Sequence, residues 1–403
     1  MMPAHSIESF FGRCPGDESK GFRYDLWWEG RHPGRTSESF RGGRAWARAI
    51  TDRWAAVPAP PRPVETPSAG PRDAPMVHFV FIGSSLPKSA AEYVKSWKRH
   101  FSNVRMWDDD SVDRVLFPAL AVAGSEGDRH RKLLADPGGP YRAAIAGGKF
   151  GFASDLLRYV VLFHFGGMYV DIDYYLLKNP PLDFWEECCS AAGLVACASN
   201  TGVAEVNNGF ILAVEPGNKI LAECIRRIER YWRDEFLPRL LPGAAGLLLG
   251  GNNGTGVPGQ SNAGHAVLAF LGGGVDDLAD GAGSEATAVV ARGAAERMGH
   301  MPPDAVIEHS GPGMFTRVLM CVLEDEEQIE SEPSSSPAFL VLPATMFHPV
   351  PNTVMGLDAS TISRWEEESR GEGKIRIDET MGLLSHYITD VTVAVHCWSR
   401  SWQ

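Results

Sequence analysis

The sequence lacks the features that would mark a nucleic-acid-binding or membrane-spanning protein. Its 38 lysines and arginines are outnumbered by 50 aspartates and glutamates, which gives a net charge of −12. Binding to a phosphate backbone needs a clustered basic surface, so we expect no nucleic-acid partner. The richest apolar stretch, Leu156–Phe165, is interrupted by Arg158 and His164. It is also much shorter than the roughly 18 residues of a membrane span.

Cysteine is also scarce, and its spacing is uninformative. The 7 cysteines are an odd number and contain no CxxC pair. They therefore predict neither a disulfide framework nor a metal or redox site, and they favour a reducing compartment. The N-terminus lacks the basic region and apolar core of a signal peptide, so a cytoplasmic location is the default expectation.

The organisation of the chain is suggested by its length and its proline content. At about 150 residues per domain, 403 residues predict two to three domains or one large domain with appendages. Residues 57–75 are so rich in proline that neither helix nor sheet can continue through them, and they are interpreted as a linker. Residues 1–56 would then be an extension with a helix over 43–56, and residues 76–403 the main domain. A stretch rich in glycine near 243–283 indicates an insertion.

Strand and helix patterns alternate at the start of this main domain. Val77–Ile82 is a buried strand by its composition, an amphipathic helix follows from Ser89, and Val104–Trp107 is a second strand. This alternation is typical of a parallel sheet with crossover helices. Further expected elements are a buried helix over 154–165 capped by Gly166 and Gly167, strands over 168–172, 194–198, 210–214 and 391–396, and a helix over 218–232.

Two carboxylates follow an apolar strand. Asp171 and Asp173 flank Ile172, and strand alternation would aim both side chains to the same side. Two carboxylates suit Mn²⁺ or Mg²⁺, and such an ion keeps open positions for the oxygens of a nucleotide diphosphate. The alternative is that the two aspartates are solvated turn residues.

A charge pair interrupts the apolar helix. Asp155 and Arg158 are three residues apart, so they share a face and can reach each other. A buried charge pair is costly to desolvate. One interpretation is a structural salt bridge in which the helix N-terminus favours Asp155. The other is that Asp155 accepts hydrogen bonds from sugar hydroxyls while Arg158 donates to a sugar or phosphate oxygen.

These residues lie in a run that resembles a known family. The run SDLLRYVVLFHFGGMYVDIDYYLLKNPPLD is similar to the DxD sugar-binding region of glycosyltransferase family 32, which includes mannosyltransferases and bacterial capsule enzymes. The glucosylating domains of clostridial toxins are more distant relatives. The resemblance extends upstream to VHFVFIG and SWKRHFSNVRMWDD, and downstream to NNGFILAVEPGNKIL, GPGMFTRVL and HCWSRSW.

The resemblance implies a GT-A type nucleotide-diphospho-sugar transferase fold, a mixed and mainly parallel sheet flanked by helices. It implies a metal-dependent hexosyltransferase, mannosyltransferase-like, that uses Mn²⁺ or Mg²⁺ and retains the anomeric configuration. The donor would be a nucleotide diphosphate sugar carrying mannose, glucose or galactose. The acceptor would be a glycan, a glycolipid such as inositol phosphorylceramide, or a protein. A membrane-bound acceptor would require peripheral membrane association, so a Golgi or endomembrane location stays open.

The resemblance also implies roles for individual residues. The catalytic residues would be Asp155, Arg158 and Asp173. The donor would be bound by Asp155, Arg158, Tyr169, Asp171, Ser401 and Trp402. The metal ligands would be Asp171, Asp173 and His396, and the acceptor side would include Asn207 and Asn208. A core position is the alternative for His396, and loop capping is the alternative for the two asparagines.

Two other functions are weaker alternatives. The run GTGVPG, with Asp276 about twenty residues beyond Gly254, matches the dinucleotide-binding pattern of an oxidoreductase. Pro258 within the turn and the absence of a preceding strand pattern disfavour it. An inactive binding protein with the GT-A fold is the other alternative, and buried charges without a use would be expensive for it.

Overall fold

The computed structural model describes residues 10–11, 43–56, 75–83, 86–178, 180, 182–201, 204–240, 282–328, 337–351 and 387–397. The chain divides into two compact units. The first holds the described residues up to Trp107, those of Leu162–Ile220, and those from Pro312 onward. The second holds Asp108–Val161 and the described part of Leu221–Gly311. The GTGVPG run, Ser401 and Trp402 lie outside the described residues, as do almost all of the linker and of the glycine-rich stretch.

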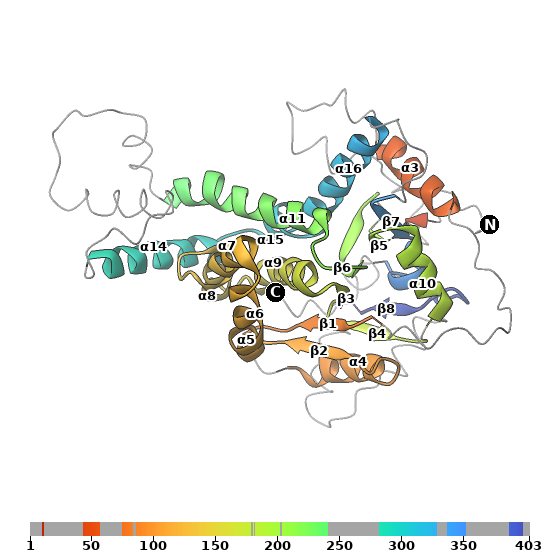
Figure 1. Cartoon of the computed structure of the whole chain (residues 1–403), viewed down its shortest axis with the longest axis horizontal. Coiled ribbons are helices and arrows are strands. Elements are labelled where there is room, and N and C mark those ends of the chain that lie inside the picture. Colours follow the sequence, from red (N-terminus) through yellow and green to blue (C-terminus); the bar gives the residue numbers. More distant parts are fainter. Residues whose placement is uncertain are drawn as a thin grey trace. The chain divides into compact units, whose positions relative to one another are not determined.

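The first unit contains a 6-stranded sheet with the order β2-β1-β3-β6-β5-β7 (Figure 1). β1 is parallel to β2 and β3, β5 is parallel to β7, and β6 runs antiparallel to β3 and β5. All strands except β6 therefore point the same way. The mixed, mainly parallel sheet that we expected is confirmed. The strands are β1 (Val77–Val80), β2 (Val104–Trp107), β3 (Gly167–Val170), β5 (Leu194–Ala198), β6 (Val206–Ala213) and β7 (Phe339–Leu342).

The core strands are buried along their whole length, which is why they are apolar runs rather than alternating patterns. Every residue of β1, β5, β6 and β7 is buried. Buried polar residues in these strands include His78 of β1. Its Nε2 lies 3.0 Å from the carbonyl oxygen of Gly166, which can only accept, so Nδ1 accepts the hydrogen bond from Trp107 Nε1 at 3.1 Å. Burial lowers the pKa of His78 to about 4.

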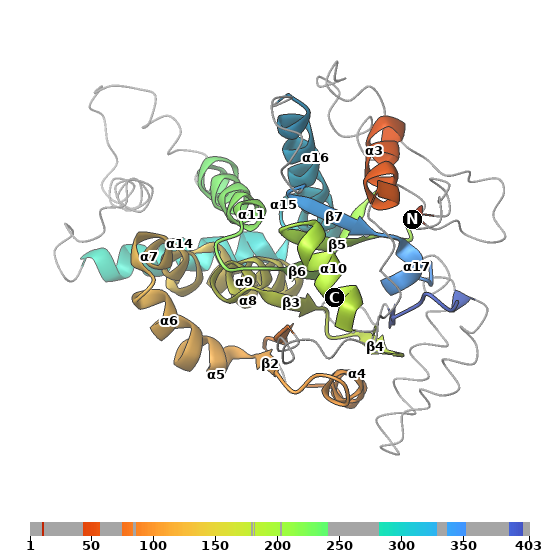
Figure 2. The same cartoon turned by 45° about the vertical axis from the view of Figure 1, so that its right-hand side comes forward.

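Helices flank this sheet (Figure 2). The crossover helix α4 (Lys88–Lys98) connects β1 and β2, and its buried Trp97 donates to the carbonyl oxygen of Tyr174 at 2.9 Å. α3 (Gly43–Ala56) has the bounds expected for the N-terminal helix and packs against β7. α16 (Pro312–Gln328) packs against β6. The remaining helices of this unit are α10 (Leu182–Ala191) and α17 (Ala344–Phe347).

A second, 2-stranded sheet joins distant parts of the first unit. β4 (Tyr174–Leu176) pairs antiparallel with β8 (Ala394–His396), and Tyr174 stands opposite His396. Three expected strands are shorter than predicted, because β1 ends at Val80, β3 ends at Val170 and β8 begins at Ala394. The expected glycine cap is confirmed, since Gly166 and Gly167 have φ of 63° and 83° where α9 ends.

The second unit is helical in its described residues. Its elements include α5 (Asp109–Ser111), η1 (Val112–Leu116), α6 (Phe117–Ala121), α7 (Gly124–Ala135), α8 (Pro140–Ala146), η2 (Tyr231–Phe236), η3 (Leu237–Leu240), α14 (Ala282–Gly299) and α15 (Pro303–His309). α9 (Phe150–Phe165) and α11 (Lys219–Arg230) belong to it over most of their length. α8 packs closely on α14. The contact leaves no room for a side chain at Gly147, where a Cβ would lie 2.6 Å from the carbonyl oxygen of Ala295.

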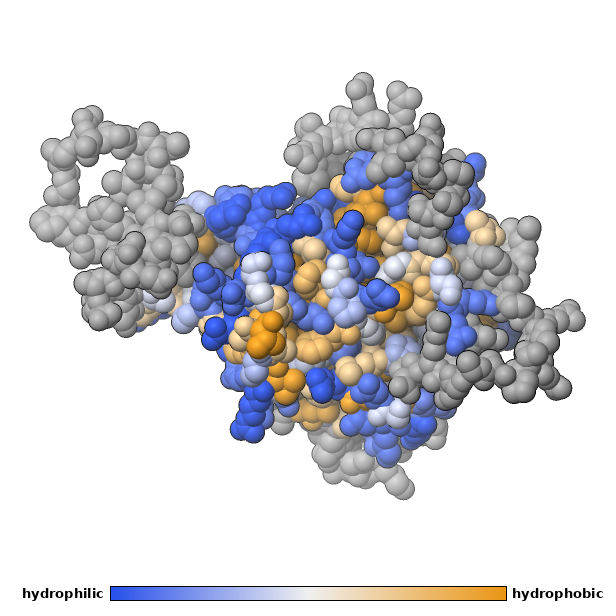
Figure 3. Space-filling model, viewed as in Figure 1, coloured by the Kyte–Doolittle hydropathy of each residue, from blue (hydrophilic) through white to orange (hydrophobic). Residues whose placement is uncertain are grey.

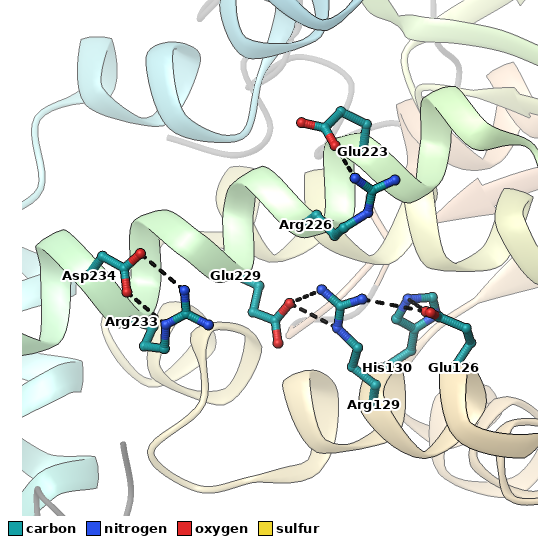
Figure 4. A network of polar contacts seen from close by, with 8 residues as sticks. All are labelled: Glu126, Arg129, His130, Glu223, Arg226, Glu229, Arg233 and Asp234. Carbon is teal, nitrogen blue, oxygen red and sulfur yellow. Dashed lines mark hydrogen bonds and ion pairs between the residues drawn. The ribbon is translucent and has the colours of Figure 1, made fainter. Parts of the chain in front are cut away.

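Ion pairs link α7 to α11 within this unit (Figure 4). Arg129 Nε donates to Glu229 Oε2 at 2.9 Å, and Glu126 lies 3.6 Å from the same guanidinium. The hydrogen bond from Glu229 raises the pKa of Arg129. Glu126 also lies 3.4 Å from Nε2 of the buried His130. These contacts are partly exposed, so each stabilises the helix packing only modestly.

Among the helices that the structure describes, none is both long and apolar enough to cross a membrane. On the face shown in Figure 3, hydrophobic and hydrophilic residues are interspersed. Single exposed valines such as Val122, at 85% exposure, are ordinary surface features.

Candidate active site

Asp171 is the first residue beyond the edge of the main sheet. Its backbone N–H donates to the carbonyl oxygen of Gly209 at 2.8 Å, which extends the pairing of β3 with β6 by one residue. Ile172 and Asp173 then form a turn, closed by the N–H of Tyr174 donating to the carbonyl oxygen of Asp171 at 3.2 Å. The prediction that strand alternation aligns the two carboxylates is therefore wrong. The turn aligns them, because the chain leaves the main sheet here to pair with β8.

The carboxylate of Asp171 occupies the space of a missing side chain. A Cβ at Gly209 would lie 2.3 Å from Asp171 Oδ2 and 2.8 Å from Asn207 Oδ1. The N–H of Gly209 donates to Asn207 Oδ1 at 2.6 Å. On the other side, the buried Tyr169 donates its hydroxyl hydrogen to Asp171 Oδ1 at 2.7 Å. Tyr169 and Gly209 together set the position of this carboxylate.

The two asparagines lie in a strand. Asn207 and Asn208 were expected in the loop before β6, but they belong to β6 itself and are buried. That expectation is wrong because pairing with β5 extends β6 to Val206, where local sequence predicts no strand. Gly209 had not been singled out from the sequence. Its sequence context, a glycine that follows two asparagines at the start of an apolar run, could have indicated it. A glycine within a strand often marks a place where another group approaches the backbone closely.

Asp173 and His396 come together through the pairing of β4 with β8. Their Oδ1 and Nε2 atoms are 3.0 Å apart, and both side chains are 8% exposed. The N–H of Cys397 donates to the carbonyl oxygen of Asp173 at 2.9 Å, which fixes the turn to β8. Asp171, Asp173 and His396 each offer a ligand atom, and these atoms lie within 4.8 Å of one another. The structure thus brings together the three residues expected to bind a metal.

A buried tyrosine and a second histidine support His396. The ring of Tyr174 stacks on His396, with centroids 4.5 Å apart and planes at 15°. The Tyr174 hydroxyl hydrogen-bonds to Nε2 of His348, whose Nδ1 lies 3.1 Å from the carbonyl oxygen of Ala198. That carbonyl can only accept, so Nδ1 carries the hydrogen and Nε2 accepts from Tyr174. Burial lowers the pKa of His348 well below its ordinary value, so this imidazole is neutral.

The donor set of this cluster fits a divalent cation. Two carboxylates and one imidazole carry an excess of negative charge when the imidazole is neutral. Buried carboxylates are costly unless a cation or hydrogen bonds compensate them. Oxygen ligands of this kind suit a hard ion that keeps further positions for phosphate oxygens. The cluster can therefore hold an ion between the protein and a diphosphate.

Asp155 and Arg158 form an ion pair inside the second unit. Arg158 Nη2 lies 3.1 Å from Asp155 Oδ1, and Ser310 donates its hydroxyl hydrogen to Asp155 Oδ2 at 2.8 Å. The hydroxyl of Tyr159 donates to the carbonyl oxygen of Ser310 at 3.0 Å. Ser310 had not been singled out from the sequence, because it lies 155 residues from Asp155.

The helix N-terminus does not explain this pair. Because α9 begins at Phe150 rather than at Ser154, Asp155 lies beyond the first turn of the helix. The expected stabilisation by the helix dipole is therefore wrong, since that effect falls off within one turn. Arg158 and Ser310 supply the compensating charge and hydrogen bond instead.

The segment that matches a known family contains four of the residues described above: Asp155, Arg158, Asp171 and Asp173. Residues 149–189 match the family described as "Glycosyltransferase sugar-binding region containing DXD motif". The resemblance noted from the sequence is confirmed for these residues, which are similar to that sugar-binding region. No curated protein matches the chain at a significant level.

Three solved structures show loose similarity. The ligand-free glycosyltransferase domain of the YGT toxin is 12% identical, with a TM-score of 0.33 over 64% of this chain and 79% of that one. The PaToxG glycosyltransferase is 17% identical, with a TM-score of 0.28 over 56% and 87%. The catalytic domain of the alpha-toxin from Clostridium novyi is 12% identical, with a TM-score of 0.30 over 61% and 72%. The fold is therefore defined here by its own strand order.

Proposed function

We propose that this protein is a metal-dependent glycosyltransferase that moves a hexose from a nucleotide diphosphate sugar to a hydroxyl acceptor. The observation that carries this proposal is the cluster of Asp171, Asp173 and His396, which lies where β3 ends. Ligands of open α/β sheets sit beyond the carboxyl ends of the strands. The DXD family match over residues 149–189 supports the same function.

The cluster would hold Mn²⁺ or Mg²⁺ through two carboxylates and one imidazole. When bound, such an ion supplies positive charge to a departing diphosphate. Tyr169 and Gly209 hold the carboxylate of Asp171 in place, and Tyr174 holds the ring of His396 through stacking. The chain thus prepares the ligand positions before the ion binds, which lowers the cost of ordering them.

The donor contacts of the remaining residues rest on the resemblance alone. Asp155 and Arg158 would contact the donor sugar, and Ser401 and Trp402 would lie near the diphosphate. Arg158 and Ser310 each contact one of the two carboxylate oxygens of Asp155 and so hold this side chain in place. The division into an extension, a linker and a catalytic domain over 76–403 likewise stays a prediction.

Retention of the anomeric configuration is the stereochemistry that we propose. The resemblance implies it, and the acceptor hydroxyl would attack from the face that the diphosphate leaves. A mannose, glucose or galactose donor and a glycan, glycolipid or protein acceptor complete the proposal. NMR of the anomeric proton in the product tests it, and an inverted linkage would contradict retention.

A thermal-shift panel tests the transferase itself. UDP- and GDP-sugars, with NAD and NADP as controls, are added with and without Mn²⁺ to the wild type and to the double variant Asp171→Ala, Asp173→Ala. A ligand at 100 times its dissociation constant stabilises the native state by about 2.7 kcal/mol. We expect one nucleotide sugar to stabilise only the wild type, and only with metal. Stabilisation by NAD or NADP without metal would favour the oxidoreductase instead.

A further inference from the structure

Polar residues lie at the start of β6. Asn207 belongs to the strand and Glu205 directly precedes it, and the pairing of β6 with β5 has a register shift beyond Asn207. Glu205 continues the ladder, because its carbonyl oxygen accepts from the N–H of Ser199 at 2.8 Å. The carboxylate of Asp171 lies where a side chain of Gly209 would be. Asp171 and Glu205 therefore both lie near the N-terminal end of β6.

Unpaired polar atoms gather in the turn that follows β5. Asn200 Oδ1 and Thr201 Oγ1 are buried and form no hydrogen bond within the described chain, whereas the neighbouring hydroxyl of Ser199 faces the carboxyl group of Glu205. The amide of Asn200 is held in place, because its Nδ2 donates to the carbonyl oxygen of Pro349 at 2.9 Å. Leaving a buried polar atom without a partner is costly. Such atoms need an explanation, and a bound molecule that pairs with them is one.

Glu205 is the charged member of this group. The residue is half-buried, and its carboxyl group lies among protein atoms. Burial raises the pKa of Glu205 to about 7, and the hydroxyl of Ser199 opposes that rise. A carboxyl group in this setting can accept hydrogen bonds from hydroxyl groups when ionised and donate one when neutral.

We propose that Asn200, Thr201 and Glu205 form a subsite that binds the hydroxyl groups of a sugar or similar polyol acceptor. An amide oxygen, a hydroxyl and a carboxyl group are the partners that neutral polyols require, and a carboxylate disfavours anionic ligands. β5 and β3 are parallel, so the turn after β5 and Asp171 after β3 lie at the same edge of the sheet. The proposal rests on the proposed transferase function, for which it names the acceptor side.

Saturation-transfer NMR with simple acceptor analogues tests the subsite. The probes are the methyl α-hexopyranosides of mannose, glucose and galactose, with the full chain, Mn²⁺ and either UDP or GDP. We expect saturation transfer to at least one hexoside in the wild type. Thr201→Val and Glu205→Gln, which preserve side-chain shape, should each reduce that transfer at least about fivefold while leaving the nucleotide signals unchanged, because a lost buried hydrogen bond costs about 1 kcal/mol or more.

Two matched variants control for general effects. Thr51→Val removes a hydroxyl that bonds only within α3, and Glu215→Gln neutralises an exposed carboxylate. Both should bind hexosides like the wild type. Equal hexoside signals in Thr201→Val and the wild type would overturn the subsite, as would a wild type that binds nucleotide but no hexoside. Hexoside binding that is lost in both subsite variants, in a chain that binds no nucleotide, would support the subsite and contradict the transferase. If Glu205→Gln fails to fold, Thr201→Val decides alone.

Discussion

Two acidic clusters in this protein differ in the partners that they hold. In the second unit, Asp155 is paired with Arg158 and with the hydroxyl of Ser310. In the first unit, Asp173 lies 3.0 Å from His396, and Asp171 completes a set of ligand atoms that lie within 4.8 Å of one another. A guanidinium is a counter-charge for a carboxylate, whereas two carboxylates and an imidazole are ligand types that a divalent cation takes. We therefore expect the two clusters to respond differently to substitution.

The largest expected effect on stability comes from removing the carboxylate charge of Asp155 in the second unit. Asp155→Asn leaves the guanidinium of Arg158 buried without its counter-charge, which should lower the free energy of unfolding by about 3–5 kcal/mol. Asp173→Asn should change it by less than about 1 kcal/mol in metal-free buffer, because an amide oxygen at this position can still accept a hydrogen bond from His396. Urea denaturation of both variants measures the difference. Equal losses would remove the distinction between the clusters.

The next effect concerns the space for the Asp171 carboxylate. Gly209→Ala places a Cβ 2.3 Å from the present position of Asp171 Oδ2, so the carboxylate must move. We expect the affinity for Mn²⁺ to fall about 10–100-fold, as it does when groups that orient metal ligands are changed. Electron paramagnetic resonance of free Mn²⁺ measures this affinity. Gly293→Ala is the matched control, because its Cβ would meet nothing within 4 Å among the described residues. Wild-type affinity in Gly209→Ala would show that the carboxylate is not confined.

A smaller effect is expected from the hydroxyl group that orients the same carboxylate. Tyr169→Phe removes the hydrogen bond to Asp171 Oδ1 and should weaken Mn²⁺ binding about tenfold. Tyr141→Phe serves as its control, because the buried hydroxyl of Tyr141 has no hydrogen-bond partner in the described structure. If both variants bind Mn²⁺ equally well, the Tyr169 hydroxyl has no role in the site.

The smallest effect should come from the partly exposed ion pairs of the second unit. Glu229→Gln weakens the link between α7 and α11, and we expect a loss of less than about 1 kcal/mol in the free energy of unfolding. Mn²⁺ affinity should stay unchanged. Urea denaturation with a parallel Mn²⁺ titration checks both expectations. A loss as large as that caused by Asp155→Asn would mean that the partly exposed ion pair contributes as much to stability as the buried one.

The sequence was most informative where local pattern and tertiary context agree. The strand over 104–107, the strand over 194–198 and the helix over 43–56 have the predicted bounds. The strand over 194–198 is the clearest case, because its apolar residues are all buried. β6 was predicted too short because Asn207 and Asn208 have low strand propensity, and pairing with β5 overrides that preference.

The candidate site was predictable in its residues but not in its geometry. Asp171, Asp173 and His396 were identified by motif, and the structure brings them together. The supporting residues could not be foreseen, because they meet through contacts between distant segments. Tyr174 and His348 are 174 residues apart, and no periodicity in the sequence links them.

Calorimetric titration of Mn²⁺ tests the central claim that Asp171, Asp173 and His396 form a cation site. The comparison is between the wild type and the double variant Asp171→Asn, Asp173→Asn, which preserves side-chain shape and removes both charges. We predict one Mn²⁺ per wild-type chain and no binding by the folded double variant. Equal Mn²⁺ binding by both proteins, or none by the wild type, would contradict the account.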